Sequence, residues 1–170
     1  SSVTFIPVPA SIIEAGTGIN VTEDDNVTIG FSGGFPPDVT GLTTAGGNLE
    51  FRSTGGSITV SENISAGGAG NISIGAGGGS LATDPGVTIT AGTGDILLSA
   101  DTMTLGGAVS GTGALSVKPV SAGRLVSLGA AGPQFDLTDT EIGYLADGFS
   151  SITLGDLFSG AVTVNTAVFR

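Results

Sequence analysis

Two short acidic clusters carry the residue types best able to do chemistry in this sequence. Their carboxylates are Asp24 and Asp25 in the first cluster, and Asp136, Asp139 and Glu141 in the second. Ca²⁺ requires hard oxygen ligands gathered in a loop, so these five residues are candidate calcium ligands. Neither cluster has EF-hand spacing, and acidic residues are also common in solvated turns and at helix N-termini. The sequence therefore predicts no cofactor, with calcium as the alternative.

Enzyme chemistry has little support in the residue types present. The chain has no histidine and no cysteine, which removes the commonest general base and the thiol nucleophile. A carboxylate pair acting on a glycoside is the remaining option, but there is no tryptophan and Tyr144 is the one tyrosine that could support a sugar. Arg52, Lys118 and Arg124 are isolated in the sequence. We therefore predict no catalytic residues and no enzyme, with a polysaccharide-acting β-helix as the alternative.

Four asparagines begin the pattern Asn-x-Ser/Thr, to which N-linked glycans are attached. They are Asn20, Asn26, Asn63 and Asn71, and they are candidate glycosylation sites. An alternative explanation is structural, because asparagine favours the corners between strands while serine and threonine fill outward strand positions.

Short strands must position these residues. Each strand is marked in the sequence by the same short motif, which we call the glycine-led phrase. One or two glycines precede two apolar β-formers that are separated by a single residue. The alternation puts one face of each strand into a core, and the glycines permit the turn into the next strand. The phrase begins at Gly18, Gly47, Gly56, Gly70, Gly86, Gly94, Gly113 and Gly160.

This repetition predicts an all-β fold, a right-handed parallel β-solenoid. An antiparallel β-sandwich is the alternative, since it also has short strands with turns about every 8 to 12 residues. The solenoid is favoured because the dipeptides typical of tight hairpins are nearly absent, apart from Asp147-Gly148. One rung should take roughly 19 to 24 residues. The apolar residues that set this estimate are Val27, Leu49, Ile72, Ile96 and Leu115, at intervals of 22, 23, 24 and 19 residues.

The chain of 170 residues is long enough for one domain with a sizeable core. We predict a lead-in or cap over residues 1–15 and a single solenoid over residues 16–170. A helical or loop insertion is expected at about residues 134–148, because Thr138 and Glu141 have the spacing of a helix-capping box.

Charge and hydropathy exclude several classes of partner. The net charge of −11 disfavours nucleic acid and anionic membrane surfaces, which bind clustered lysine and arginine. Membrane insertion is not expected, because the sequence has no uninterrupted run of about 20 apolar residues.

Part of the sequence resembles a known family. A Leu-Thr-Asp-x-Glu segment at Leu137 to Glu141 precedes a strand-like segment, Ile152 to Leu154, then Gly155-Asp156 and a further glycine-led segment, Ser159 to Val164. Together with the run Gly-Thr-Gly-Asp-Ile-Leu-Leu-Ser-Ala at 92–100, this order resembles the repeats of filamentous-haemagglutinin-like exoproteins, very large bacterial β-strand-repeat surface proteins and adhesins. The resemblance covers roughly residues 46–170. It implies a parallel β-helix, export across a Gram-negative outer membrane and an adhesive role at the cell surface or after release.

We therefore expect an extracellular or cell-surface structural and adhesive β-solenoid segment, a rod or filament element of a bacterial surface or secreted protein. Its expected partners are further copies stacked end to end or flanking parts of a longer chain, and host or surface glycans. One alternative function is a carbohydrate-binding or carbohydrate-active β-helix, with a groove formed by loops such as 32–45 and 130–150. The other is a calcium-dependent surface module.

Overall fold

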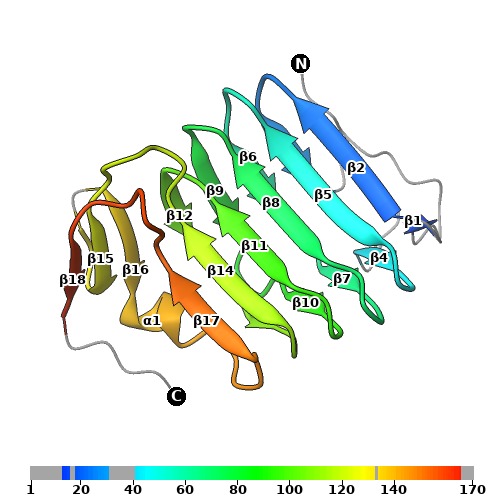
Figure 1. The fold of residues 1–170 in the computed structure, drawn as a ribbon. Coiled ribbons are helices and arrows are strands. Elements are labelled where there is room, and N and C mark those ends of the chain that lie inside the picture. Colours follow the sequence, from blue (N-terminus) through cyan, green and yellow to red (C-terminus); the bar gives the residue numbers. More distant parts are fainter. Residues whose placement is uncertain (1–12, 16–17, 31–40, 133, 166–170) are drawn as a thin grey trace.

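The glycine-led phrases become strands that stack in parallel. The computed structural model describes residues 13–15, 18–30, 41–132 and 134–165, and it is a parallel β-solenoid (Figure 1). Every strand pairing in these residues is parallel, so the antiparallel sandwich is wrong. Most of the predicted lead-in, residues 1–12, lies outside the described residues, and its last part forms the first strand.

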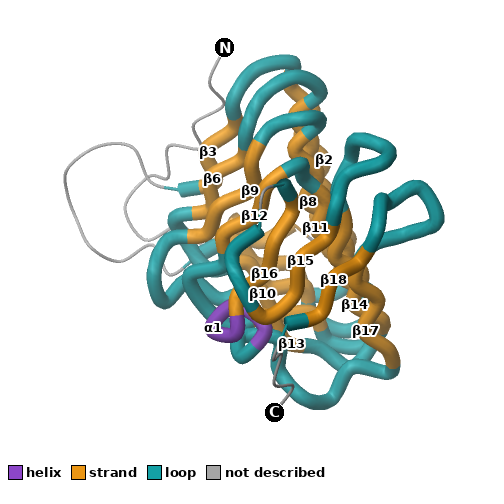
Figure 2. Tube along the Cα trace, turned by 90° about the vertical axis from the view of Figure 1, so that its left-hand side faces the viewer, coloured by secondary structure: helices purple, strands orange, loops and turns teal. Residues whose placement is uncertain are grey.

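The strands form four sheets that run along the stack. Sheet A contains β1 (Ile13–Ala15), β4 (Leu42–Thr44), β7 (Ile64–Ala66), β10 (Ile89–Ala91) and β13 (Val109–Ser110). Sheet B contains β2 (Gly18–Glu23), β5 (Asn48–Ser53), β8 (Ile72–Ala76), β11 (Ile96–Ser99), β14 (Ala114–Lys118) and β17 (Ser151–Leu154). Sheet C contains β3 (Val27–Ile29), β6 (Ile58–Val60), β9 (Ser80–Thr83) and β12 (Thr102–Thr104). Sheet D contains β16 (Phe135–Thr138), β15 (Val126–Gly129) and β18 (Val162–Val164). Sheets B and C form different sides of the stack (Figure 2).

Strand pairing along sheet B tests the predicted rung length. Leu49 pairs with Ile72, which pairs with Ile96, which pairs with Leu115, so the intervals of 23, 24 and 19 residues are confirmed. The interval from Val27 to Leu49 is wrong, because Val27 belongs to sheet C and pairs with Ile58. Alternation identifies a strand but does not say which side of the rung it occupies.

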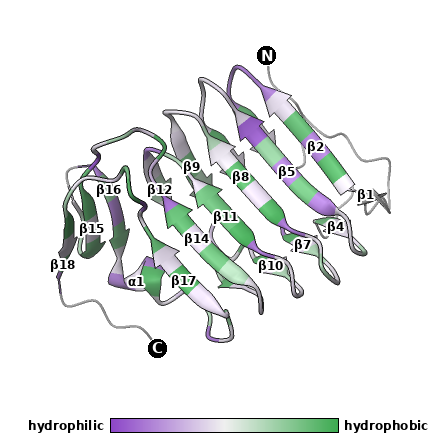
Figure 3. Cartoon of the chain, viewed as in Figure 1, coloured by the Kyte–Doolittle hydropathy of each residue, from purple (hydrophilic) through white to green (hydrophobic). Residues whose placement is uncertain are grey.

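The core is built from the apolar residues at alternate strand positions. Buried and outward-facing positions alternate along β5, β8, β11 and β14 of sheet B. In β5 and β14 the outward positions are mostly polar, whereas β11 has the apolar Leu97 at an outward position (Figure 3). Burying an aliphatic or phenylalanine side chain contributes about 1.5–3 kcal/mol, so the inward-facing apolar residues of the strands supply most of the driving force for folding. Residues at equivalent positions of successive strands form columns along the stack. The columns inside sheet B are Leu49, Ile72, Ile96 and Leu115, and Phe51, Ile74, Leu98 and Val117.

A column of glycines sits at the corner before sheet B. Its members, Gly47, Gly70, Gly94 and Gly113, each lie just before a strand of sheet B. A Cβ atom added at Gly70 would overlap the carbonyl oxygen of Gly47, and the same overlap recurs between Gly94 and Gly70 and between Gly113 and Gly94. The rungs are therefore too close at this corner for any side chain.

Next to the glycines, side-chain oxygens join one rung to the next. Asn48 Oδ1 accepts the amide of Asn71 (2.9 Å), Asn71 Oδ1 accepts that of Asp95 (2.8 Å), and Asp95 Oδ1 accepts that of Ala114 (2.7 Å). Asn26 and Asn63 make the same bond at other corners. We call Asn48, Asn71 and Asp95 the Asx ladder. Through it, corner amides that lie outside the regular sheet are satisfied.

The C-terminal part of the stack holds an extra strand, β15, which lies between β16 and β18 in sheet D. After β14 the chain forms β15 and then, through residues 130–134, β16, which pairs in parallel with β15. Because β16 also contacts β12, sheet D continues sheet C. On the side of β15 that faces away from β16, β15 pairs with β18. Parallel neighbours usually need a much longer connection. Here the connection passes so close to β15 that a Cβ on Gly132 would lie 2.5 Å from the Ser127 Cβ.

The predicted insertion contains the short helix α1 (Asp139–Ile142) directly after β16. Its capping box is confirmed: Thr138 Oγ1 accepts the amide of Glu141 (3.4 Å), and Glu141 Oε2 accepts the amide of Thr138 (2.8 Å). Within the described ranges, no helix has the length and apolar character needed to cross a membrane.

We predict that Gly94→Ala destabilises the fold by about 1–3 kcal/mol, because the new methyl group would force two rungs apart. Gly46→Ala is the matched control, since an added Cβ there meets no atom within 4 Å. It should be neutral or stabilising by up to about 1 kcal/mol. Urea unfolding midpoints measure both changes. Equal midpoints for the two variants would contradict the close approach of rungs at this corner.

We predict a smaller loss for Asn71→Ala, about 1 kcal/mol, because the amide of Asp95 loses its acceptor. Asn20→Ala removes an asparagine whose side chain, among the described residues, hydrogen-bonds to the exposed Glu50 side chain alone, and it should have almost no effect. Amide hydrogen exchange at Asp95 provides a second readout. Unchanged protection of this amide in Asn71→Ala would contradict the Asx ladder.

Candidate functional site

The candidate calcium ligands do not converge. Asp24 and Asp25 lie in the corner after β2, at the N-terminal end of the stack, whereas the second cluster lies on β16 and α1. Glu141 is buried, and its Oε1 accepts the amide of Leu105 (3.0 Å) while its Oε2 is held by Thr138. Among the described residues, no three acidic side chains come together in a way that could hold a metal ion.

The environment of Asp136 is electrostatically unfavourable for a carboxylate. Partial burial raises the pKa of Asp136, the neighbouring charge of Glu141 raises it further, and a hydrogen bond from the Gly132 amide opposes both. Of the three residues in this cluster, Glu141 belongs to the capping box with Thr138, and calcium binding stays a prediction.

The four sequon asparagines are all exposed, and each has a structural partner. Asn71 belongs to the Asx ladder, and Asn26 and Asn63 accept the amides of the next rung in the same way. Asn20 Nδ2, the atom to which a glycan would be attached, donates to Glu50 Oε2 (2.9 Å). The structural explanation is thus supported for Asn26, Asn63 and Asn71, which lie at corners, but not for Asn20, which lies within β2. Glycosylation of all four stays a prediction.

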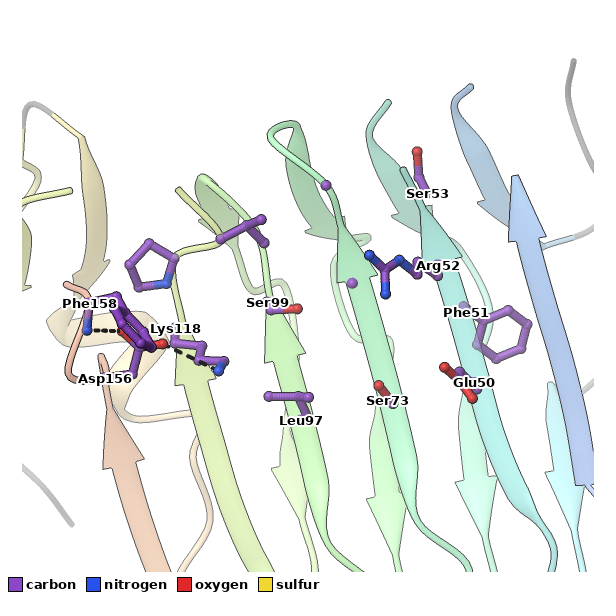
Figure 4. Close-up of a pocket in the computed structure, with 14 residues that line it drawn as sticks. Glu50, Phe51, Arg52, Ser53, Ser73, Leu97, Ser99, Lys118, Asp156 and Phe158 are labelled. Atoms are coloured by element: carbon purple, nitrogen blue, oxygen red, sulfur yellow. Dashed lines mark hydrogen bonds and ion pairs between the residues drawn. The ribbon is translucent and has the colours of Figure 1, made fainter. Parts of the chain in front are cut away.

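A groove of about 380 Å³ lies on the outer face of sheet B (Figure 4). It is not the groove expected from loops 32–45 and 130–150, of which residues 32–40 and 133 lie outside the described residues. Its floor is made of the outward-facing residues Ser73 and Gly75 of β8 and Leu97 and Ser99 of β11. The residues that line it are Glu50, Phe51, Arg52, Ser53, Ser73, Gly75, Gly77, Leu97, Ser99, Lys118, Pro119, Val120, Asp156 and Phe158.

Two cations face each other across this floor. Arg52 pairs with Gly75, Gly75 with Ser99, and Ser99 with Lys118, so these four residues form one row across sheet B. Arg52 and Lys118, which are isolated in the sequence, are thus brought into one row by the fold. The sequence could have indicated this row, because its four residues are separated by the same intervals of 23, 24 and 19 residues as the core residues of the same strands.

The loop after β17 closes one end of the groove. Lys118 Nζ lies 3.3 Å from Asp156 Oδ2, and Asp156 Oδ1 accepts the amides of Phe158 (2.9 Å) and Ser159 (3.0 Å). Desolvation works to raise the pKa of Asp156, but the Phe158 amide and the Lys118 ammonium outweigh it and hold the pKa below its ordinary value. Asp156 therefore stays charged and compensates Lys118.

The loop after β14 is fastened to the preceding rung by Asp101. This nearly buried carboxylate accepts the amide (2.7 Å) and the hydroxyl (2.5 Å) of Ser121, and Arg124 Nε lies 3.6 Å from its Oδ1. Burial alone would raise the pKa of Asp101, but the bonds from Ser121 and the charge of Arg124 lower it below its ordinary value.

The C-terminal end of the stack exposes positions that inner rungs bury. Leu115 is fully buried, whereas its partner in the last rung, Ile152, is 38% exposed. In sheet D, Val126 is 1% exposed and its partner Val162 is 51% exposed. Val164 likewise is 65% exposed. These residues, Ile152, Val162 and Val164, are called the open end.

We predict that Asp101→Asn destabilises the protein by about 1–2 kcal/mol at pH 7, because charged hydrogen bonds are lost. The folded-state pKa of Asp101 is lowered, so its contribution is complete above about pH 4 and is lost as the pH falls through the folded-state value. The difference between wild type and variant should therefore shrink below about pH 4. Urea titrations across this range measure it, with the exposed Asp147→Asn as control. A difference independent of pH would contradict the assigned role.

Two features of the described surface are candidates for function, the groove on sheet B and the open end. No protein-family model, curated protein or solved structure matches the chain. A functional assignment therefore depends on the geometry of these two features and on the sequence resemblance of residues 46–170.

Proposed function

We propose that this chain is an extracellular structural and adhesive element, a rod whose copies join end to end into a filament. The observation that carries the proposal is the open end. Its apolar residues occupy the columns that are buried in inner rungs, so a further rung placed there would bury them in the same way.

Among the described residues, the outer strand of sheet B at this end is β17, and the outer strand at the opposite end is β2. Strands at sheet edges carry unpaired backbone groups that can accept a strand from another chain. Because all strands of sheet B are parallel, β17 of one copy can continue into β2 of the next without reversing direction. Such a head-to-tail contact does not close on itself and generates a filament.

The opposite end has the matching character. Ile19 and Val21 of β2 are half-buried, whereas their partners in β5, Leu49 and Phe51, are fully buried. Joining β17 to β2 would bring the half-buried Ile19 and Val21 against the exposed Ile152 and the half-buried Leu154, and so bury apolar area on both sides.

Charge favours this mode of association over others. The net charge of −11 makes copies repel when they meet side by side, whereas an apolar end and unpaired strands offer a specific contact. The resemblance to filamentous-haemagglutinin-like exoproteins supports placing such a rod at a bacterial surface or outside the cell. No catalytic residue is required for this role.

We predict that the wild-type chain grows in mass with concentration, and that the double variant Val162→Glu, Val164→Glu stays monomeric because charge at the open end prevents stacking. Light scattering measures the mass. Thr102→Glu, Thr104→Glu is the matched control, since it adds the same charge to exposed positions of sheet C and should assemble like the wild type.

A wild-type chain that remains monomeric at all concentrations would overturn the proposal. Equal loss of assembly in both double variants would also contradict it, since the effect would then come from charge rather than from the open end.

A further inference from the structure

The groove on sheet B has one charge that its surroundings do not compensate. Arg52 has no hydrogen-bond or ion-pair partner among the described residues, and its side chain is exposed. Lys118 at the other end of the row is paired with Asp156. Glu50, the nearest acid on the same strand, also lines the groove, and its Oε2 accepts from Asn20 on the neighbouring strand β2. The groove therefore offers one guanidinium to an anionic ligand, in a chain that is otherwise strongly acidic.

The chemistry of a guanidinium restricts the anion. Arginine presents a planar fork that matches a carboxylate through two parallel hydrogen bonds. A ligand with many anionic groups is disfavoured, because Lys118 is already compensated and the net charge of the chain is −11. The groove thus fits a ligand that places one carboxylate at Arg52.

The remaining surface fits a hydroxyl-rich ligand with flat apolar faces. Ser73 and Ser99 provide hydroxyl donors and acceptors on the floor, and Gly75 between them lets a ring approach the sheet. Phe158 lines the end near Lys118 and is 73% exposed, so it offers an aromatic face for stacking (Figure 4). Val120 extends this apolar wall.

The length of the groove selects an oligomer. Arg52 and Lys118 are separated by three strand intervals, which at about 4.8 Å each give about 14 Å between their backbones. A single sugar ring cannot bridge this distance, whereas a short oligosaccharide can. A peptide fits less well, because the backbone groups of the floor strands β5, β8, β11 and β14 are already paired within the sheet.

We infer that the outer face of sheet B binds an acidic oligosaccharide across its strands, with a carboxylate at Arg52, sugar hydroxyls on Ser73 and Ser99, and a ring stacked on Phe158. This site is separate from the open end and does not depend on filament formation.

The test is a titration of the full chain with an unsulfated tetrasaccharide of alternating uronic acid and N-acetylhexosamine units, followed by amide NMR shifts. Val162→Glu and Val164→Glu at the open end are included in every protein titrated, the reference called wild type among them, so that the chain is monomeric whether or not filaments form. The matched ligand is the same tetrasaccharide with its carboxyl groups reduced to alcohols. We expect shifts at Arg52, Gly75 and Ser99, and an affinity for the acidic form about fivefold higher than for the reduced form.

Three variants locate the interaction. Arg52→Gln should lower the affinity for the acidic form to that for the reduced form, and Phe158→Ser should weaken both forms by a similar factor. Thr104→Asp on sheet C makes the same change in net charge as Arg52→Gln and should leave both affinities unchanged. Unchanged urea midpoints show that the variants remain folded.

The inference is overturned if no groove amide shifts, if the two tetrasaccharides bind equally to the wild type, or if Arg52→Gln still prefers the acidic form. It is also overturned if Thr104→Asp reduces binding as much as Arg52→Gln, since the effect would then be one of total charge.

Discussion

The stacking of one rung directly on the next, with parallel strands about 4.8 Å apart, is the constraint on which the rest of this molecule depends. At that distance the corner before sheet B has no room for side chains, which explains the column of Gly70, Gly94 and Gly113. It also leaves corner amides in need of acceptors, which Asn71 and Asp95 supply. Within the described residues, no buried side-chain polar atom lacks a hydrogen-bond partner. The same repeated dipeptide, a glycine followed by an asparagine or aspartate, therefore allows the rungs to pack closely and gives the corner amides their hydrogen-bond acceptors.

This repetition explains why the solenoid could be predicted from the sequence. Each copy of the glycine-led phrase forms the same local structure, a corner followed by a strand. Apolar alternation and corner glycines were therefore sufficient to indicate stacked strands and three of the four rung lengths. The interval from Val27 failed because equal phrases occupy different sheets, and their assignment depends on how the corners turn. The extra strand β15 had no distinguishing pattern, since its position is set by contacts between β12 and β16 that are distant in sequence.

The candidate site was harder to predict because it is a property of register rather than of any motif. Arg52 and Lys118 are unremarkable in the sequence, and they share a row only because the strands of sheet B pair in one register. The acidic clusters behave in the opposite way: they are conspicuous in the sequence, yet the oxygens of Glu141 are occupied by Thr138 and Leu105. In this solenoid the inward positions form the core, whereas the outward positions do not contribute to it and are free to vary.

The central claim is that the open end continues the stack into a second copy, and electron cryo-microscopy of the assembled chain tests it most directly. We expect filaments in which the strands run across the filament axis and sheet B is continuous, with β17 of one copy beside β2 of the next. Monomers at every concentration, or assemblies in which copies meet through the outer faces of sheets B or C, would contradict the account.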